Sequence, residues 1–85
     1  MAHKQQLIQF IADTIEEVTL GQTQAASVSA GQRLLDDLGL DSLDYATVLL
    51  SCEQWLGIAI DEDGIDWRTV ATVEELADFF LEQRP

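Results

Sequence analysis

The chain has 85 residues, of which sixteen are Asp or Glu and four are Lys or Arg, so its formal net charge is −12. A chain of this length forms one domain with a modest core, and its hydrophobic fraction of 47% is ordinary for a globular protein. So acidic a surface repels nucleic acid and anionic membranes, and it attracts partners that present a basic docking patch.

Apolar residues recur at helical spacing near the N-terminus and predict an amphipathic helix over about residues 4–20. Gly21 is placed to stop this helix. Residues 21–41 are mostly small and polar, without a sustained period, and they predict a long loop. The expected anchors of this loop in the core are Val28, Leu34, Leu35 and Leu38.

A second helix is predicted over residues 42–56, with Asp41 as its N-cap and Gly57 at its end. Asp44 stands where the acid of a capping box would stand, with a shorter side chain. Two apolar stripes share this helix. One stripe consists of Tyr45, Val48, Leu49, Cys52 and Leu56, and the other of Leu43, Ala46 and Leu50. One core needs only one stripe, so the second is available for another role.

The rest of the chain predicts an extended connection, a short helix at about residues 66–70, and a last helix over residues 72–83. Thr72 and Glu75 form the sequence pattern of a capping box at the start of that helix. Trp55 and Trp67 are expected to serve packing. The sequence therefore predicts an all-α fold, a small bundle of three main helices plus one short helix, in a single domain over residues 1–85.

Catalytic and metal-binding roles find little support in the sequence. Ser42 has no neighbouring base to activate it, because His3 is the only histidine. The acidic run Asp61–Gly64 lacks both end ligands of a calcium loop. Cys52 is the only cysteine, which excludes an internal disulfide and a cysteine-based zinc site. It lies on an apolar stripe away from basic residues, and we expect a packed thiol with a raised pKa.

Ser42 has a position that suits a phosphate ester better than a nucleophile. Asp41 supplies the helix cap, which leaves the Ser42 side chain free in the first turn. A phosphate attached there would meet unpaired backbone N–H groups and the positive end of the helix dipole. The flanking acids then need another purpose, such as docking an enzyme.

The run "DDLGLDSLD", residues 36–44, resembles the signature of the acyl carrier proteins and the related peptidyl carrier proteins. The resemblance extends over about residues 28–80, and the first helix agrees by pattern. It implies that Ser42 carries 4′-phosphopantetheine, attached by a phosphopantetheinyl transferase. Asp41 and Leu43 match the residues that flank that serine in the family, and Asp44 matches the acid that usually follows.

The resemblance also implies roles for the two faces of the second helix. The expected partner-docking residues are Asp41, Leu43, Asp44, Ala46, Thr47 and Leu50. The residues expected to pack inside or to line a cargo cavity are Tyr45, Leu49 and Cys52. Tyr45 is expected to narrow the mouth of such a cavity and to disfavour a long sequestered acyl chain.

The resulting expectation is a free-standing, monomeric, cytoplasmic carrier protein without catalytic activity of its own. Its expected partners, besides the transferase, are a loading ligase or acyltransferase and downstream ketosynthase, condensing or tailoring enzymes. Thr47, Ser51 and Gln54 are neutral where fatty-acid carriers have several glutamates, which favours polyketide-type or related secondary metabolism. The alternatives are an aminoacyl or peptidyl carrier of a nonribosomal peptide-type pathway and an unmodified acidic helical interaction module.

Overall fold

The computed structural model describes residues 4–60 and 70–83, and these form three α-helices and one short 3₁₀ turn. The helices are α1, Lys4–Val18; α2, Ser42–Leu56; and α3, Val73–Glu82. The 3₁₀ turn η1, Ala25–Ser27, lies in the long connection between α1 and α2. No strand occurs in the described ranges, which confirms the all-α fold predicted from the sequence. The short helix expected at residues 66–70 falls almost wholly outside the described residues.

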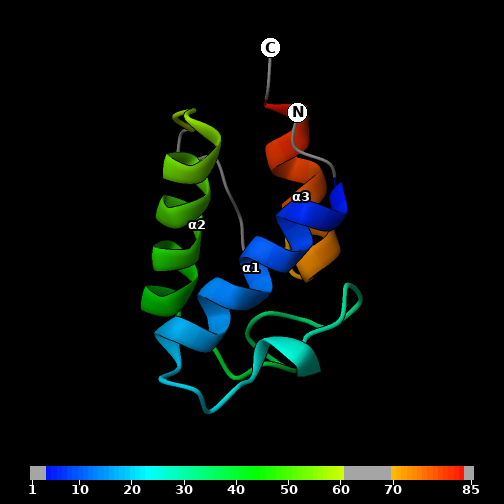
Figure 1. The fold of residues 1–85 in the computed structure, drawn as a ribbon, viewed down its shortest axis with the longest axis vertical. Coiled ribbons are helices and arrows are strands. Elements are labelled where there is room, and N and C mark those ends of the chain that lie inside the picture. The colour runs from blue at the N-terminus through cyan, green and yellow to red at the C-terminus, as the bar shows by residue number, and fades with distance from the viewer. Residues whose placement is uncertain (1–3, 61–69, 84–85) are drawn as a thin grey trace.

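Helix α1 crosses the molecule between α2 and α3 and packs against both (Figure 1). Its side chains at every third or fourth position, Leu7, Ile11 and Ile15, are fully buried, as the spacing predicts. The buried residues that meet them come from the α1–α2 connection, α2 and α3. They are Leu34, Leu38, Leu40, Tyr45, Val48, Leu49, Cys52, Val73, Leu76, Ala77 and Phe80.

The C-terminus of α1 differs from the prediction. The helix ends at Val18, two residues before the predicted end, because Leu20 adopts a left-handed backbone conformation with φ 54°. The Gly21 N–H donates to the Glu16 carbonyl and the Leu20 N–H to the Glu17 carbonyl, which is the bond pattern of a Schellman motif. Glycine usually occupies the left-handed position that Leu20 takes here. The prediction therefore placed the stop at Gly21, one residue after the residue that ends the helix.

Both ends of α2 agree with the prediction. At its start the Asp41 side chain accepts a hydrogen bond from the Asp44 N–H at 2.8 Å. At its end Gly57 has φ 70° and donates its N–H to the Glu53 carbonyl. A residue without Cβ adopts this left-handed conformation without steric cost, so the helix ends sharply there.

The loop before α2 is fixed to the start of α3 by backbone hydrogen bonds. An isolated antiparallel bridge joins Arg33 and Thr72. The Leu34 N–H donates to the Ala71 carbonyl at 2.8 Å, and the Val73 N–H donates to the Gln32 carbonyl at 3.1 Å. These bonds hold residues 32–34 of the loop against the start of α3, and so help to position the N-terminus of α2.

Helices α1 and α3 are also joined at the surface. The Lys4 Nζ lies 2.8 Å from Glu74 Oε1 and 3.1 Å from Asp78 Oδ1, and these bonds raise the pKa of Lys4. The pairs are solvent-exposed, so each contributes little to stability. None of the helices in residues 4–60 and 70–83 is long and apolar enough to cross a bilayer.

Candidate functional site

Ser42 is the first residue of α2 and its side chain lies at the surface. The loop that leads to it is anchored on both sides of Gly39, because Leu38 and Leu40 are buried in the core. The Leu40 N–H donates to the Leu34 carbonyl at 3.1 Å, which closes this loop into a compact turn. Ser42 is therefore an exposed residue on a rigid support, reachable by a modifying enzyme.

The first turn of α2 has an arrangement that accommodates an anion. Asp41 occupies the N-cap and binds the Asp44 N–H, and the Tyr45 N–H donates to the Asp41 carbonyl. Within the described residues, the N–H groups of Ser42 and Leu43 have no hydrogen-bond acceptor. Free N–H groups at a helix start, together with the helix dipole, favour a phosphate at this point. A phosphate ester on the Ser42 oxygen fits the residues present.

Asp44 departs from the capping box that the sequence suggested. Only one half of the box is formed, since no bond from the Asp44 carboxylate back to the Asp41 N–H is present among the described residues. The aspartate side chain is one methylene shorter than the glutamate that usually makes this contact. The Asp44 carboxylate consequently remains available to a partner.

The outer face of α2 exposes apolar side chains next to acids. Leu43 is 74% exposed and Leu50 is 50% exposed, while Ala46 between them is half-buried. Thr47 is exposed on the same side, and its hydroxyl donates to the Leu43 carbonyl. The predicted second stripe thus lies at the surface, as expected of residues that do not serve the core.

The inner face of α2 is buried in the bundle. Tyr45, Leu49 and Cys52 are at most 5% exposed. The Tyr45 hydroxyl donates a hydrogen bond of 2.8 Å to the Val70 carbonyl, just before α3, so the ring spans the space between α2 and that segment. Burial, with a smaller effect from Glu53, raises the pKa of Cys52 to about 12. The thiol is a packed core group, as the sequence predicted.

One aromatic residue of α2 has a role at the edge of the core. The Trp55 ring stacks on the Phe10 ring of α1, with centroids 4.7 Å apart and planes within 8°. Trp55 nevertheless remains 43% exposed. Its contact with Phe10 agrees with a packing role, and Trp67 lies outside the described residues.

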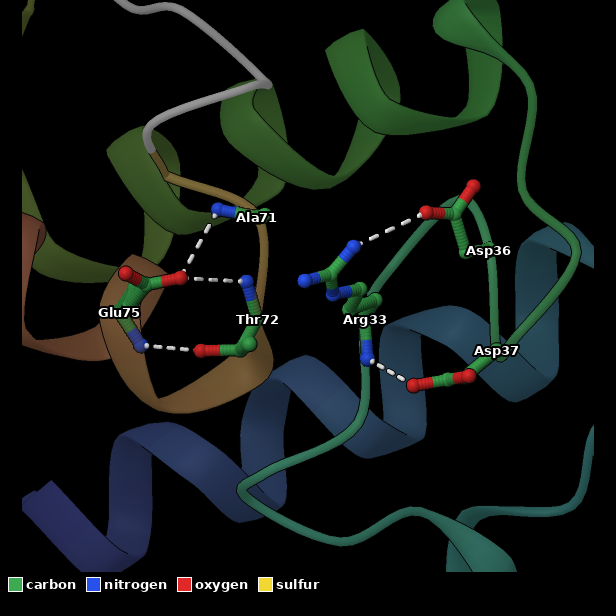
Figure 2. A network of polar contacts seen from close by, with 6 residues as sticks. All are labelled: Arg33, Asp36, Asp37, Ala71, Thr72 and Glu75. Atoms are coloured by element: carbon green, nitrogen blue, oxygen red, sulfur yellow. Dashed lines mark hydrogen bonds and ion pairs between the residues drawn. The ribbon is translucent and has the colours of Figure 1, made fainter.

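A surface groove that the sequence did not predict lies between the loop before α2 and the start of α3. Its volume is about 620 Å³, within the range of small-molecule sites. It is lined by Gly31, Arg33, Leu35, Asp36, Ala71, Thr72, Glu74 and Glu75. Figure 2 shows the polar residues of this region, with the Arg33 guanidinium between the Ala71–Thr72 backbone and Asp36. The long-range backbone bonds around the bridge between Arg33 and Thr72 bring these segments together, and local sequence patterns carry no signal for them.

The Glu75 side chain is fixed at the edge of this groove. Its Oε1 accepts hydrogen bonds from the Thr72 N–H at 3.1 Å and the Ala71 N–H at 3.2 Å, and its own N–H donates to the Thr72 hydroxyl. These contacts complete the capping box predicted for α3. The Thr72 bond and then the Ala71 bond hold the pKa of Glu75 below its usual value.

Comparison with known proteins identifies the family. The family described as "Phosphopantetheine attachment site" matches residues 6–80. The acyl carrier protein of Sinorhizobium fredii is 31% identical over 71 residues, covering 81% of this chain and 88% of that protein. The "Meromycolate extension acyl carrier protein" of Mycolicibacterium aurum is 33% identical over 85 residues, covering 99% and 86%. The acyl carrier protein of Kineococcus radiotolerans is 35% identical over 71 residues, covering 82% and 85%.

The chain belongs to the phosphopantetheine-binding carrier protein family. It is a carrier that bears a covalently attached 4′-phosphopantetheine and has no catalytic activity of its own. When attached, the prosthetic group supplies a thiol that holds cargo as a thioester. The partners of a carrier protein are a phosphopantetheinyl transferase and the enzymes of a biosynthetic pathway.

Proposed function

We propose that Ser42 is the attachment point and that the protein delivers acyl thioesters to partner enzymes. The observation that carries this proposal is the exposed Ser42 side chain at the start of α2, beside N–H groups that favour a phosphate. Ser51, the other serine of α2, is half-buried and lies in the middle of the helix. The family match supports the proposal, since the matched residues include Ser42.

The attachment step requires a hydroxyl and a transferase. The Ser42 oxygen forms a bond to the phosphorus of the pantetheine half of coenzyme A. The pyrophosphate bond of coenzyme A breaks, the nucleotide half leaves, and the hydroxyl proton passes to the transferase or to solvent. The carrier contributes an accessible oxygen and a helix start that stabilises the new phosphodiester. It needs no general base of its own, which agrees with the residues around Ser42.

The outer face of α2 is the proposed docking surface. Leu43, Ala46 and Leu50 supply an apolar centre, and Asp41, Asp44 and Thr47 surround its N-terminal part. A small apolar contact with charged surroundings gives fast encounter and easy release. Both properties suit a carrier that visits several enzymes in turn.

The proposed cargo is an acyl group in polyketide-type or related secondary metabolism. The relatives reported above are named acyl carrier proteins, which supports an acyl cargo over an aminoacyl one. Thr47 and Gln54 are exposed, uncharged residues of α2. This low charge along α2 supports a dedicated set of partner enzymes in place of the general fatty-acid enzymes.

The proposed cargo stays outside the helical bundle. Tyr45 fills the space between α2 and the segment before α3, and its hydroxyl is bonded to the Val70 carbonyl. Leu49 and Cys52 lie in the core behind it, where they are at most 3% exposed. An acyl chain that entered the core between these residues would have to displace the Tyr45 ring and break its hydrogen bond, which disfavours a long sequestered chain.

Intact mass tests the attachment point. The protein is incubated with a broad-specificity phosphopantetheinyl transferase and coenzyme A, and we expect a gain of one phosphopantetheine. Ser42→Ala should abolish the gain, while Ser51→Ala, in the same helix, should keep it. Asp41 still caps the helix in Ser42→Ala, so circular dichroism should show an unchanged fold. Modification of Ser42→Ala, or no modification of the wild type beside a modified control carrier, contradicts the proposal.

A further inference from the structure

We propose that the groove between the loop before α2 and the start of α3 binds the pantetheine part of the protein's own prosthetic arm. The proposal rests on the attachment at Ser42 proposed above, and it assigns Arg33 as the main hydrogen-bond donor to the arm. The arm thereby has a resting position on the carrier, outside the helical core.

The greatest possible distance from Ser42 to the groove is close to the length of the arm. The hydrogen bond between the Leu40 N–H and the Leu34 carbonyl brings these two residues together across the turn. Ser42 lies two residues after Leu40, and Arg33 and Leu35 flank Leu34. With Cα atoms 3.8 Å apart along the chain, the Cα atoms of Ser42 and either groove residue are at most roughly 18 Å apart. The arm has fourteen bonds from the serine oxygen to the sulfur, and at peptide-like bond geometry it extends roughly 16 Å.

The lining residues match the chemistry of the arm. Pantetheine alternates amide groups with methylene and methyl groups and carries one hydroxyl. Leu35 and Ala71 offer apolar contacts, while Arg33 offers donors to amide carbonyls. Asp36 and Glu75 offer carboxylate oxygens to amide N–H groups. The groove therefore presents both kinds of surface that the arm needs.

Arg33 is the residue best placed to hold the arm. Its backbone is fixed by the bridge to Thr72, so the side chain projects from a rigid point. The Arg33 Nη1 lies 3.4 Å from Asp36 Oδ2, which is longer than a good hydrogen bond, and the side chain is 63% exposed. The remaining guanidinium donors have no hydrogen-bond acceptor among the described residues. Figure 2 shows the guanidinium at the centre of this region, with two nitrogens directed away from Asp36.

The charge of the groove favours the uncharged part of the arm over a free anion. Arg33 is the one basic residue of the lining, against Asp36, Glu74 and Glu75. Lys4 partly offsets this excess, because its ammonium contacts Glu74 at 2.8 Å. A carboxylate ligand would meet net repulsion, whereas two amides and a hydroxyl are neutral and can bond with both signs of charge.

Isotope-filtered nuclear Overhauser spectroscopy on the holo protein tests the proposal. The protein is labelled with ¹³C and ¹⁵N, and its arm is unlabelled. We expect contacts between the methyl groups of the arm and the methyl groups of Leu35 and Ala71. In Arg33→Gln these contacts should be lost, and the amide shifts of Gly31 and Ala71 should move towards their values in unmodified protein. Arg84→Gln removes the same charge at the end of the sequence and should leave the contacts unchanged.

The outcomes separate this proposal from the attachment at Ser42. Holo protein that gains the phosphopantetheine mass on Ser42 but shows no arm contact with Leu35 or Ala71 overturns the groove proposal alone. Groove contacts that persist unchanged in Arg33→Gln also overturn it. Failure of the mass gain overturns the attachment proposal instead, and it is seen before any spectrum is recorded.

Discussion

Asp41 and Ser42 are adjacent residues with different tasks at the start of α2. The Asp41 carboxylate satisfies the Asp44 N–H, so the serine is not needed as a cap. Ser42 is exposed at the surface, where an enzyme can reach it. A serine at an N-cap would instead be occupied by a backbone N–H. The one-residue offset between cap and serine leaves the side chain free for the modification proposed above.

Cys52 is expected to be inert in the folded protein. Burial raises the pKa of its thiol to about 12, and only the thiolate reacts with alkylating reagents. We predict that native protein reacts with iodoacetamide at pH 8 at least about 100-fold more slowly than urea-unfolded protein, because the thiolate fraction falls tenfold for each unit of pKa. Intact mass as a function of time measures both rates.

The arm thiol of the holo protein is the internal control for this experiment. It should be alkylated rapidly in the native state and give a single adduct. A second adduct forming at a similar rate would show that Cys52 is accessible.

The raised pKa of Cys52 also predicts the pH range over which this thiol affects the stability of the fold. Its contribution is fully present below the ordinary value of 9.0 and is lost as the pH rises towards about 12, because the unfolded thiol ionises first.

At the scale of elements, α3 depends on the capping box at its start. The Thr72 hydroxyl accepts the Glu75 N–H at 3.0 Å, and the helix has only ten residues. We predict that Thr72→Ala lowers the free energy of unfolding by about 1 kcal/mol, the usual effect of removing a threonine N-cap. Urea unfolding followed by circular dichroism measures this change as a lower midpoint.

Thr47→Ala is the matched control for this substitution. Thr47→Ala also removes one hydroxyl hydrogen bond, which Thr47 donates to the Leu43 carbonyl. Thr47, however, is not a cap: it lies within the length of α2, with its side chain exposed. Because alanine is a better helix former than threonine, the free energy of unfolding of Thr47→Ala should stay within about 0.5 kcal/mol of wild type. Equal losses in the two variants would argue against a special role of the cap.

The sequence predicted those elements whose determinants are local. The caps Asp41 and Thr72, the left-handed end at Gly57, and the buried stripe of α2 all depend on residues within one or two turns. The end of α1 was misplaced, because nothing in the local pattern indicates that Leu20 adopts a left-handed conformation as well as Gly21, which has φ 83°.

The features that the sequence did not predict depend on tertiary contacts. Leu40 was not assigned to the core, but it is 4% exposed. The groove around Arg33 depends on bonds between residues almost forty positions apart, which no periodicity encodes. The position of Ser42 was predictable because it needs only a cap, a helix start and a loop. The groove around Arg33 was not, because it exists only once the loop and α3 have met.

At the scale of the whole molecule, we expect the charge of −12 to influence how the carrier meets its partners. A basic docking patch on an enzyme attracts the whole acidic molecule over about a Debye length, and the attraction weakens as salt is added. In the docking proposed above, the exposed leucines of α2 then provide the short-range contact. Long-range charge and local apolar contact therefore act at different stages of one encounter.

This separation between long-range charge attraction and short-range apolar contact predicts the effect of removing one acid from the proposed docking face. Asp44→Asn should raise the KM of the phosphopantetheinyl transferase for the carrier about 2- to 5-fold with little change in kcat, as expected for one exposed charge pair. The difference from wild type should shrink as sodium chloride rises from about 0.05 M to about 0.5 M, because salt screens that pair. The rate of mass gain at several carrier concentrations gives both constants.

Glu82→Gln is the control that separates local docking from net charge. It removes the same charge from the last residue of α3, at the opposite end of the molecule from the start of α2 (Figure 1). If the charge of Asp44 contacts the transferase directly, Glu82→Gln should behave like wild type at both salt concentrations. Equal increases in KM for the two variants would mean that overall charge alone steers the encounter, and that the first turn of α2 has no acidic contact with the enzyme.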